Sequence, residues 1–408
     1  MRRSSPGELD DIVLVVSPKT PSRWFATFLL AAVGAASCLV PPKPEPPPPP
    51  PPSGRPLKLV HPSGEVKKPP PLAGFMRGMN LGNGLDAPKE GEWGVKLDTR
   101  HFDAYAKAGF DHVRLPVRFS AHTANAPPFA IDEAFLSRVD WAIDQALSHD
   151  LRVIIDLHHY EELMKEPGRH EARFLAMWKQ IAERYKTRPA SVAFELVNEP
   201  NGELKPDPLN RLLNQTLKIV RTSNPHRIVM VEPYFWASAD HLFELAVPND
   251  DPNLLATFHC YNPILFTHQG ASFMGPEYQT VGIVFPGPPD HPIVPVVAAR
   301  AVDWIRNWFD GYNSKRSEDN PGGTQAIVDY FEHAQRFAAK TGLRLYLGEF
   351  AAIDRADMAS RERYTRFVRE EAERRGFGWA YWDDGGSMKA FDFQANRWIQ
   401  PIEDALLH

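Results

Sequence analysis

Short apolar runs typical of buried β-strands alternate with amphipathic helical segments along most of this chain. Eight such runs follow one another between residues 75 and 383, and helical patterns separate them. Eight strands alternating with helices are the number that closes a (β/α)8 barrel. A doubly wound open sheet is the alternative, but no glycine-rich phosphate-binding turn follows the first run. We therefore predict an α/β TIM barrel with strands at 75–83, 112–117, 152–159, 192–198, 228–234, 254–261, 345–350 and 378–383.

The connection after the sixth strand-like run is much longer than the others. Residues 262–320 form an extended loop insertion, and loops of this length in a compact domain are usually functional. Within it, Trp304, Trp308 and Tyr312 recur at every fourth position and share one helical face. We predict that this face docks a helix onto the barrel, with a wall facing the substrate as the alternative. The other helices are expected at 98–108, 132–149, 170–186, 208–223, 324–341 and 357–375.

The first 71 residues have a different character from the rest. Residues 1–40 contain an apolar segment that ends at Cys38, in a context that resembles the lipobox of bacterial lipoproteins. The segment is shorter than the ~20 residues of a membrane span. A lipid anchor, a cleaved signal peptide and an uncleaved signal anchor remain open, and all three export the protein. Residues 41–71 are proline-rich and are expected to form a disordered, extended linker, leaving 72–408 as the catalytic domain.

Charge and cysteine content narrow the classes of partner. Lys and Arg number 46 against 51 Asp and Glu, a balance that does not suggest a nucleic-acid partner. Two cysteines, Cys38 and Cys260, do not form a disulfide framework, and Cys260 lies in an apolar run as a buried thiol. We expect a monomer whose only membrane contact is through its N-terminus.

Two glutamates stand at the ends of strand-like runs, where TIM barrels build their active sites. Glu199 follows the fourth run in Asn198-Glu199-Pro200, and Glu349 ends the seventh run. Two carboxyl groups that face each other at ~5 Å suit a retaining glycoside hydrolase. We predict that Glu349 is the nucleophile, with Arg114 as the charge partner that lowers its pKa. Glu199 is then the acid/base, which must hold a proton in the resting enzyme.

Other strand tips carry side chains that can bind sugars. Asn198 is placed to bond a sugar 2-hydroxyl, Tyr261 to donate to the nucleophile, and Trp382 to form the floor of a subsite. His158 and His159 invite a zinc site, but no helical HExxH motif or cysteine pair completes one. We therefore expect no metal, and expect these histidines to bond sugar hydroxyls.

Because these residues occur in this order along the chain, residues 72–408 resemble the endoglucanase type of glycoside hydrolase family 5, in clan A. The resemblance implies a barrel, retention of anomeric configuration, no cofactor, and Glu199 and Glu349 as acid/base and nucleophile. The motifs that carry it lie at 80–94, 109–116, 158–162, 198–200, 266–270 and 348–350. The resemblance also implies sugar-binding roles for Asn83, Arg114, His158, His159, Asn198, His259, Tyr261, His268 and Trp382, to which the strand-tip positions add Asp86 and Trp236.

Departures from the family pattern bear on the substrate. Asp86 stands where similar proteins often have glutamate, and Phe273 lies near a position that is often tryptophan. We expect an exported, retaining endo-β-1,4-glucanase (a cellulase) acting on a polysaccharide, with β-mannan, xyloglucan or a bacterial exopolysaccharide as alternative substrates. A transglycosylase shares the same intermediate. A non-catalytic polysaccharide-binding barrel is the other alternative, against which the presence of both glutamates and Arg114 argues.

Overall fold

The computed structural model describes residues 74–316 and 319–408. Within the described residues, one compact unit comprises residues 74–271 and 276–408 except 317–318, and Ser272–Gly275 group with a second unit whose remaining residues lie outside the described part. The predicted leader with Cys38 and the proline-rich linker also lie outside the described residues. Among the helices that are described, none combines the length and apolar character needed to cross a bilayer.

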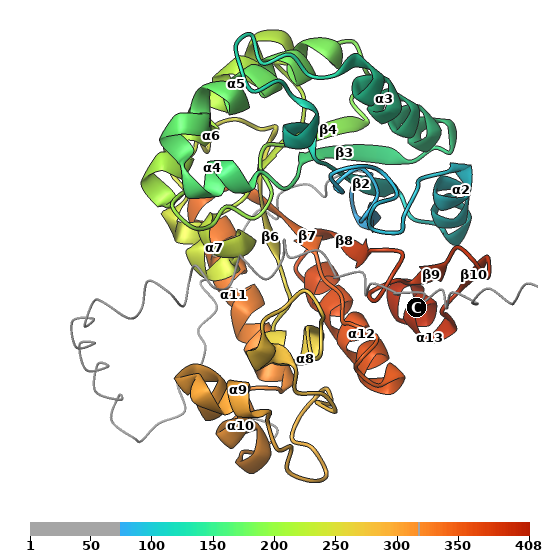
Figure 1. Cartoon of the computed structure of the whole chain (residues 1–408), viewed down its shortest axis with the longest axis vertical. Helices are drawn as coiled ribbons and strands as arrows, with labels where there is room; N and C mark the ends of the chain where they lie inside the picture. The colour runs from blue at the N-terminus through green and yellow to red at the C-terminus, as the bar shows by residue number, and fades with distance from the viewer. Residues whose placement is uncertain (1–73, 317–318) are drawn as a thin grey trace, which may run out of the picture. The chain divides into compact units, whose positions relative to one another are not determined.

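Eight parallel strands form a closed barrel in sequence order (Figure 1). The last strand pairs with the first, with Asn80 opposite Trp382 in register, so no sheet edge remains open in the barrel. This confirms the predicted TIM barrel and excludes the open sheet. The strands are β1 (Arg77–Leu81), β2 (His112–Val117), β3 (Arg152–Leu157), β4 (Val192–Glu195), β5 (Val229–Val231), β6 (Leu254–His259), β7 (Arg344–Glu349) and β8 (Gly378–Asp383).

Several strands end before the apolar pattern ends, because the chain turns sharply at the barrel mouth. His159, Glu199 and Trp236 follow β3, β4 and β5 with positive φ angles of 48°, 47° and 56°. This left-handed conformation is rare for residues other than glycine and cannot continue a strand. The predicted strands that ran to 159, 198 and 234 are therefore too long at this end.

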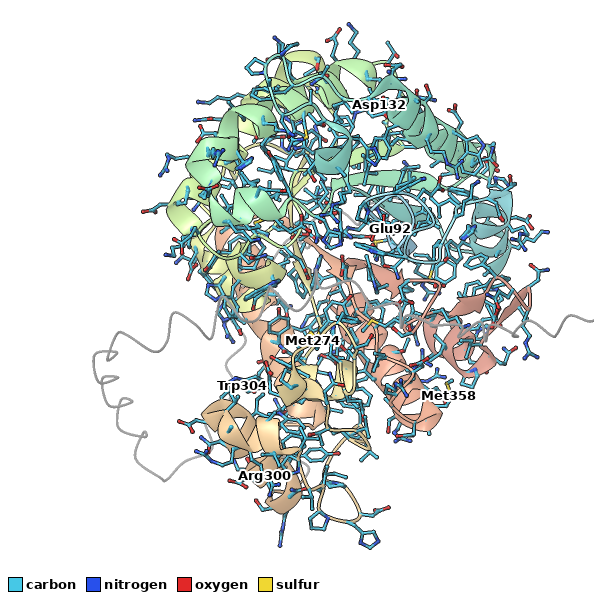
Figure 2. The ribbon with its side chains drawn as sticks, viewed as in Figure 1. Glu92, Asp132, Met274, Arg300, Trp304 and Met358 are labelled. Atoms are coloured by element: carbon cyan, nitrogen blue, oxygen red, sulfur yellow. The ribbon has the colours of Figure 1, made fainter. Side chains whose placement is uncertain are left out.

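The helices surround the strands, and α2, α3 and α12 begin at capping side chains. Asp98 caps α2 by accepting from the Arg100 N–H, and α2 ends at the left-handed Gly109. Asp132 accepts from the Phe135 N–H at the start of α3 (Figure 2). The larger helices are α2 (Thr99–Ala108), α3 (Glu133–Ser148), α5 (Pro167–Arg184), α6 (Pro206–Ser223), α10 (Asp303–Ser314), α11 (Thr324–Thr341), α12 (Met358–Arg374) and α13 (Gln400–Leu407). Shorter elements are η1 (Phe119–His122), α4 (Glu161–Lys165), α7 (Tyr234–Ala237), η2 (Ala239–Glu244), α8 (Ile264–Thr267), η3 (Pro276–Tyr278), α9 (Val297–Ala301), β9 (Phe391–Asp392) and β10 (Arg397–Trp398).

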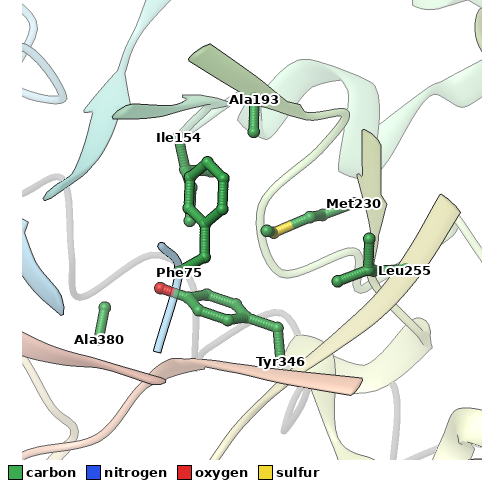
Figure 3. Close-up of a cluster of buried hydrophobic side chains, with 7 residues drawn as sticks. All are labelled: Phe75, Ile154, Ala193, Met230, Leu255, Tyr346 and Ala380. Atoms are coloured by element: carbon green, nitrogen blue, oxygen red, sulfur yellow. The ribbon is translucent and has the colours of Figure 1, made fainter. Parts of the chain in front are cut away.

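One end of the barrel interior is filled by apolar side chains, all fully buried (Figure 3). The cluster has one residue from each of β3 to β8 and Phe75 from just before β1, so the barrel is a packed core rather than a pore. Its members are Phe75, Ile154, Ala193, Met230, Leu255, Tyr346 and Ala380. Polar side chains are thereby left to the opposite end, where the strands finish.

The insertion between β6 and α11 contains α8, η3, α9 and α10. Helix α10 buries Ile305, Phe309 and Tyr312, whereas Trp304 of the predicted face is 48% exposed (Figure 2). The helix packs on α9 and on the insertion's own segment near Val284 and Ile293, so direct docking of the predicted face onto the barrel is not confirmed. The Tyr312 hydroxyl donates to the Val284 carbonyl, 2.9 Å away. The next residue, Phe285, donates its N–H to Ser360 in α12, so this segment ties the insertion to the barrel helices.

Candidate active site

Two glutamates from opposite parts of the barrel approach each other at its mouth. Glu349 ends β7, and Glu199 lies four residues beyond β4. One carboxylate oxygen of each, together with a ring nitrogen of His259, all lie within 4.8 Å of one another. The two residues are 150 positions apart in sequence, and barrel closure brings their carboxyl groups together.

Arg114 is the centre of the polar network beneath these carboxyl groups. Its guanidinium is fully buried and donates to Glu349 Oε1 at 2.8 Å, confirming the predicted ion pair. It also donates to Asn80 Oδ1 at 3.0 Å and to Asn198 Oδ1 at 2.8 Å. Its Nε atom donates to Glu195 Oε2 at 2.8 Å. Arginine suits this position because its planar fork of N–H groups can serve several acceptors at once.

Three buried carboxyl groups that the sequence analysis did not single out complete this network. Asp156 in β3 and Glu195 in β4 lie 3.0 and 2.8 Å from Arg114 nitrogens, and Glu232 follows β5. Burial raises the pKa of Asp156 and of Glu232 well above the ordinary range. Burial also tends to raise the pKa of Glu195. The Arg114 charge and a hydrogen bond with Glu232 outweigh this effect, so the Glu195 pKa is lowered. In the sequence, each of these three carboxyl groups could have been found as an acidic residue inside or directly after an apolar strand.

Glu349 is held by two donors yet is deeply buried. The Tyr261 hydroxyl donates to Glu349 Oε2 at 2.9 Å, as predicted, while Arg114 holds Oε1. Burial nevertheless raises the pKa of Glu349 against the lowering effects of His259 and Arg114. The expectation that Arg114 gives this carboxyl a low pKa is therefore wrong in net direction, because desolvation exceeds the pairing energy.

His259 lies between the two carboxyl groups. Its Nδ1 is 2.9 Å from Glu199 Oε1 and 3.6 Å from Glu349 Oε2, and its Nε2 is 3.2 Å from Glu232 Oε1. Burial favours the neutral ring, but the charges of Glu349 and Glu232 prevail and raise the pKa of His259 well above its usual value. An imidazolium donates from both nitrogens, so it serves as a buried cation between carboxylates.

A second group of predicted residues lines another side of the mouth. His158 stacks on Trp382 with ring centroids 5.7 Å apart, and His159 packs edge-on against His158 at 4.3 Å. The pKa values of both histidines are well below the usual range because they are buried, so both rings are neutral. Neutral imidazole can both donate and accept, as sugar hydroxyls require. Asn83 donates from its side chain to the Asp384 carbonyl at 3.1 Å.

Asp86 is fully buried beside these histidines. Its Oδ2 accepts from the Asn83 N–H at 3.0 Å, whereas its Oδ1 has no hydrogen-bond partner. Burial, with a smaller contribution from the charges of Glu349 and Asp156, raises its pKa to about 7 against the lowering effect of the Asn83 N–H. Asp86 can therefore exist protonated near neutral pH.

The two remaining predicted residues lie on loops at the mouth. The ring of His268 packs edge-on against Tyr261 at 4.9 Å, and burial lowers its pKa to about 4. Trp236 is 43% exposed, and its backbone N–H donates to the carbonyl of Pro200, the residue after Glu199. Phe235, Trp236 and Ala237 all have positive φ, so an unusual turn presents this indole at the barrel mouth.

Three sets of side chains within the described residues bring possible metal-ligating atoms within 4.8 Å of one another. Two of these sets contain His259, whose raised pKa keeps it protonated and therefore unable to ligate. Of the three sets, the third (Asp86, His158 and His159) is the one whose imidazoles are neutral and could therefore ligate a metal ion.

Known proteins are similar to this chain in sequence. The family described as "Cellulase (glycosyl hydrolase family 5)" matches residues 74–387. Endoglucanase H of Acetivibrio thermocellus is 33% identical over 308 residues, which cover 76% of this chain and 29% of that protein. The match to Cellulase/esterase CelE of the same organism covers 35% of that protein, so this chain spans about a third of these two curated relatives.

Two solved structures have folds similar to this chain. The cellulose synthase subunit Z of Clostridioides difficile is 35% identical, with a TM-score of 0.71 over 82% of this chain and all of that chain. Endoglucanase Cel5A of Thermotoga maritima is also 35% identical, with a TM-score of 0.70 over 82% of this chain and 97% of that chain. Structures of Cel5A have been determined with cellobiose and with mannotriose.

Proposed function

Since this chain belongs to glycosyl hydrolase family 5, we propose that it is a retaining endo-β-1,4-glucanase with Glu349 as nucleophile and Glu199 as acid/base. The observation that carries this proposal is the approach of the two carboxyl groups, with oxygens within 4.8 Å. Retaining glycosidases have carboxyl groups roughly 5–5.5 Å apart, whereas inverting enzymes need roughly 6.5–9.5 Å to admit a water molecule.

The first step forms a covalent glycosyl-enzyme. The Glu349 carboxylate attacks the anomeric carbon while Glu199 transfers its proton to the departing glycosidic oxygen, which leaves as a sugar hydroxyl. Tyr261 and Arg114 each donate to one oxygen of Glu349 and so aim the carboxylate at the sugar. The His259 imidazolium, 2.9 Å from Glu199 Oε1, stabilises the negative charge that appears on Glu199 as its proton leaves.

The second step reverses these roles. The Glu199 carboxylate takes a proton from water, and the resulting hydroxyl attacks the anomeric carbon and displaces Glu349 as a carboxylate. Two inversions at one carbon restore the original anomeric configuration. If a sugar hydroxyl arrives in place of water, the same step is a transglycosylation.

Sugar binding is assigned to side chains along the mouth. Asn198 is held by Arg114 next to the acid/base, where its amide can bond the sugar 2-hydroxyl. Trp382, His158 and His159 form one wall with ring faces and neutral nitrogens. Trp236, beside Pro200, is suited to stack on the sugar that leaves with the protonated oxygen. Asn83 and His268 complete the set, and the fully buried Asp86 supports Asn83 by accepting from its backbone N–H. His259 and Tyr261 act on the carboxyl groups.

Cellulose-type glucan is the first substrate we propose, and β-mannan is the second. Support for glucan comes from relatives named endoglucanase. Support for mannan comes from the complex of Thermotoga maritima Cel5A with mannotriose, since that protein is 35% identical to this chain. We further propose that residues 1–40 export the protein, that Cys38 is a lipid attachment site, and that residues 41–71 tether a monomeric catalytic domain comprising 72–408.

Alanine variants of the two glutamates test the proposal. Glu349→Ala should lose turnover of carboxymethyl cellulose and aryl cellobiosides, whereas Glu199→Ala should keep turnover of activated aryl glycosides, which need little protonation. Added azide should yield the α-glycosyl azide with Glu349→Ala and the β-glycosyl azide with Glu199→Ala. Exposed Glu203→Ala serves as the control and should retain activity. Polysaccharide activity in both active-site variants would contradict the assignment.

A further inference from the structure

Glu232 is a buried carboxyl group that has no place in the mechanism above. It directly follows β5 and is fully buried, so it cannot touch a substrate. Its Oε2 accepts a close hydrogen bond from the backbone N–H of Glu199. That N–H belongs to a residue with a φ of 47°, a left-handed backbone conformation that is strained for a residue other than glycine. The hydrogen bond to Glu232 Oε2 holds the turn that directs the Glu199 side chain across the mouth.

The second oxygen of Glu232 reaches the other end of the same residue. Glu232 Oε1 lies 3.2 Å from His259 Nε2, and His259 Nδ1 lies 2.9 Å from Glu199 Oε1. Glu232 therefore contacts the backbone of Glu199 directly. It also acts on the Glu199 carboxyl group indirectly, through the imidazole of His259. The Glu232–His259 contact is an ion pair without aligned hydrogen-bond geometry. The charge of His259 opposes the rise that burial causes in the Glu232 pKa, and the charge of Glu232 in turn raises the pKa of His259, so the pair favours the protonated ring.

Resting on the proposed function, we propose that Glu232 is a positioning residue for the acid/base Glu199, acting through the Glu199 amide and through His259. When Glu199 gives up its proton, its new negative charge faces a ring that Glu232 keeps protonated. The effect falls chiefly on proton transfer to the leaving oxygen, because His259 Nδ1 lies nearer to Glu199 Oε1 (2.9 Å) than to Glu349 Oε2 (3.6 Å). Glu232 therefore affects substrates in proportion to how much protonation their leaving group needs.

A second buried carboxyl group at a strand tip provides a matched control. Asp383 ends β8 and accepts from the backbone N–H groups of Gly385, Ala390 and Phe391. It supports a loop in the same way that Glu232 supports a turn, but its hydrogen bonds within the described residues reach neither Glu199 nor His259. Loss of Asp383 reports what removal of a buried strand-tip carboxylate does to the fold alone.

The test compares leaving groups. For full-length Glu232→Gln, kcat/KM for phenyl β-cellobioside should fall tenfold or more, while that for 2,4-dinitrophenyl β-cellobioside should fall less than threefold. Asp383→Asn should lower both by a common factor. Glu232→Asp, which keeps the charge but shortens the reach, is judged by the same ratio if the glutamine variant does not fold. Equal losses on the two substrates would overturn the inference.

A double mutant separates this inference from the proposed function. If Glu232 acts through Glu199, adding Glu232→Gln to Glu199→Ala should change the phenyl cellobioside rate less than twofold, because the coupled group is already gone. Multiplicative losses would refute the positioning role. Failure of Glu199→Ala itself to discriminate between leaving groups would instead refute the acid/base assignment of Glu199.

Discussion

Replacement of Asp86 by asparagine should remove a pH-dependent loss of stability. Asp86 is fully buried with an unpartnered Oδ1, and its pKa is raised from the usual 3.8 to about 7, chiefly by burial. The folded protein thus binds this proton more tightly than the unfolded chain does. Stability from this group is fully present below about pH 4, declines as the pH rises, and is lost above about pH 7.

The size of the effect follows from the pKa difference. A rise from 3.8 to about 7 corresponds to about 4 kcal/mol in the free energy of unfolding. Asparagine is nearly isosteric, keeps an acceptor for the Asn83 N–H and cannot ionise. The free energy of unfolding of the wild type, relative to that of Asp86→Asn, should therefore fall by up to about 4 kcal/mol between pH 4 and pH 8.

Guanidinium denaturation of both proteins at half-unit intervals from pH 4 to pH 8 measures this difference. Exposed Asp250→Asn controls for the loss of one negative charge. A difference between wild type and Asp86→Asn that varies by less than ~1 kcal/mol over this range would show that the buried carboxyl does not carry a raised pKa.

Three further predictions concern other parts of the molecule. Arg114→Met should lower the free energy of unfolding by ~3–5 kcal/mol, because it leaves buried carboxylates unpaired, and urea denaturation measures this; a loss below ~1 kcal/mol would contradict the central role of the arginine. Trp236→Ala should lower kcat/KM about tenfold for cellopentaose but less for aryl cellobiosides, which lack the leaving sugar; equal losses would place the indole elsewhere. In a Cys38→Ser background, Cys260, whose pKa burial raises to about 12, should react with a thiol reagent at pH 8 only after denaturation, and rapid labelling of the native protein would be inconsistent with its burial.

The barrel and its reacting pair could be predicted because they depend on local patterns. Glu199 and Glu349 stand out as acidic residues that finish apolar runs, and the strand count alone places them at one mouth. Strand ends were less predictable. The side chains of His159, Glu199 and Trp236 continue the pattern of the strands, while their backbones have already turned into the left-handed region.

The carboxyl groups beneath the site escaped prediction for a different reason. Asp156 and Glu195 lie inside strands whose neighbours are apolar on both faces, so the pattern does not say which side chains point inward. The direction of the Glu349 pKa shift is a balance between burial and pairing with Arg114 and His259. Both contributions are large and opposite in sign, and their sum depends on coordinates rather than on residue type.

The connectivity of Arg114 has a consequence for biosynthesis. Its partners Asn80, Asn198 and Glu349 lie 34, 84 and 235 positions away in the chain. At 5–20 residues per second, Glu349 leaves the ribosome roughly 10–50 s after Arg114 has been made. Until β7 joins the sheet, the guanidinium lacks its last acceptor and Glu349 is not held at the barrel mouth. Synthesis of the seventh strand therefore sets the earliest moment at which the nascent chain can acquire activity.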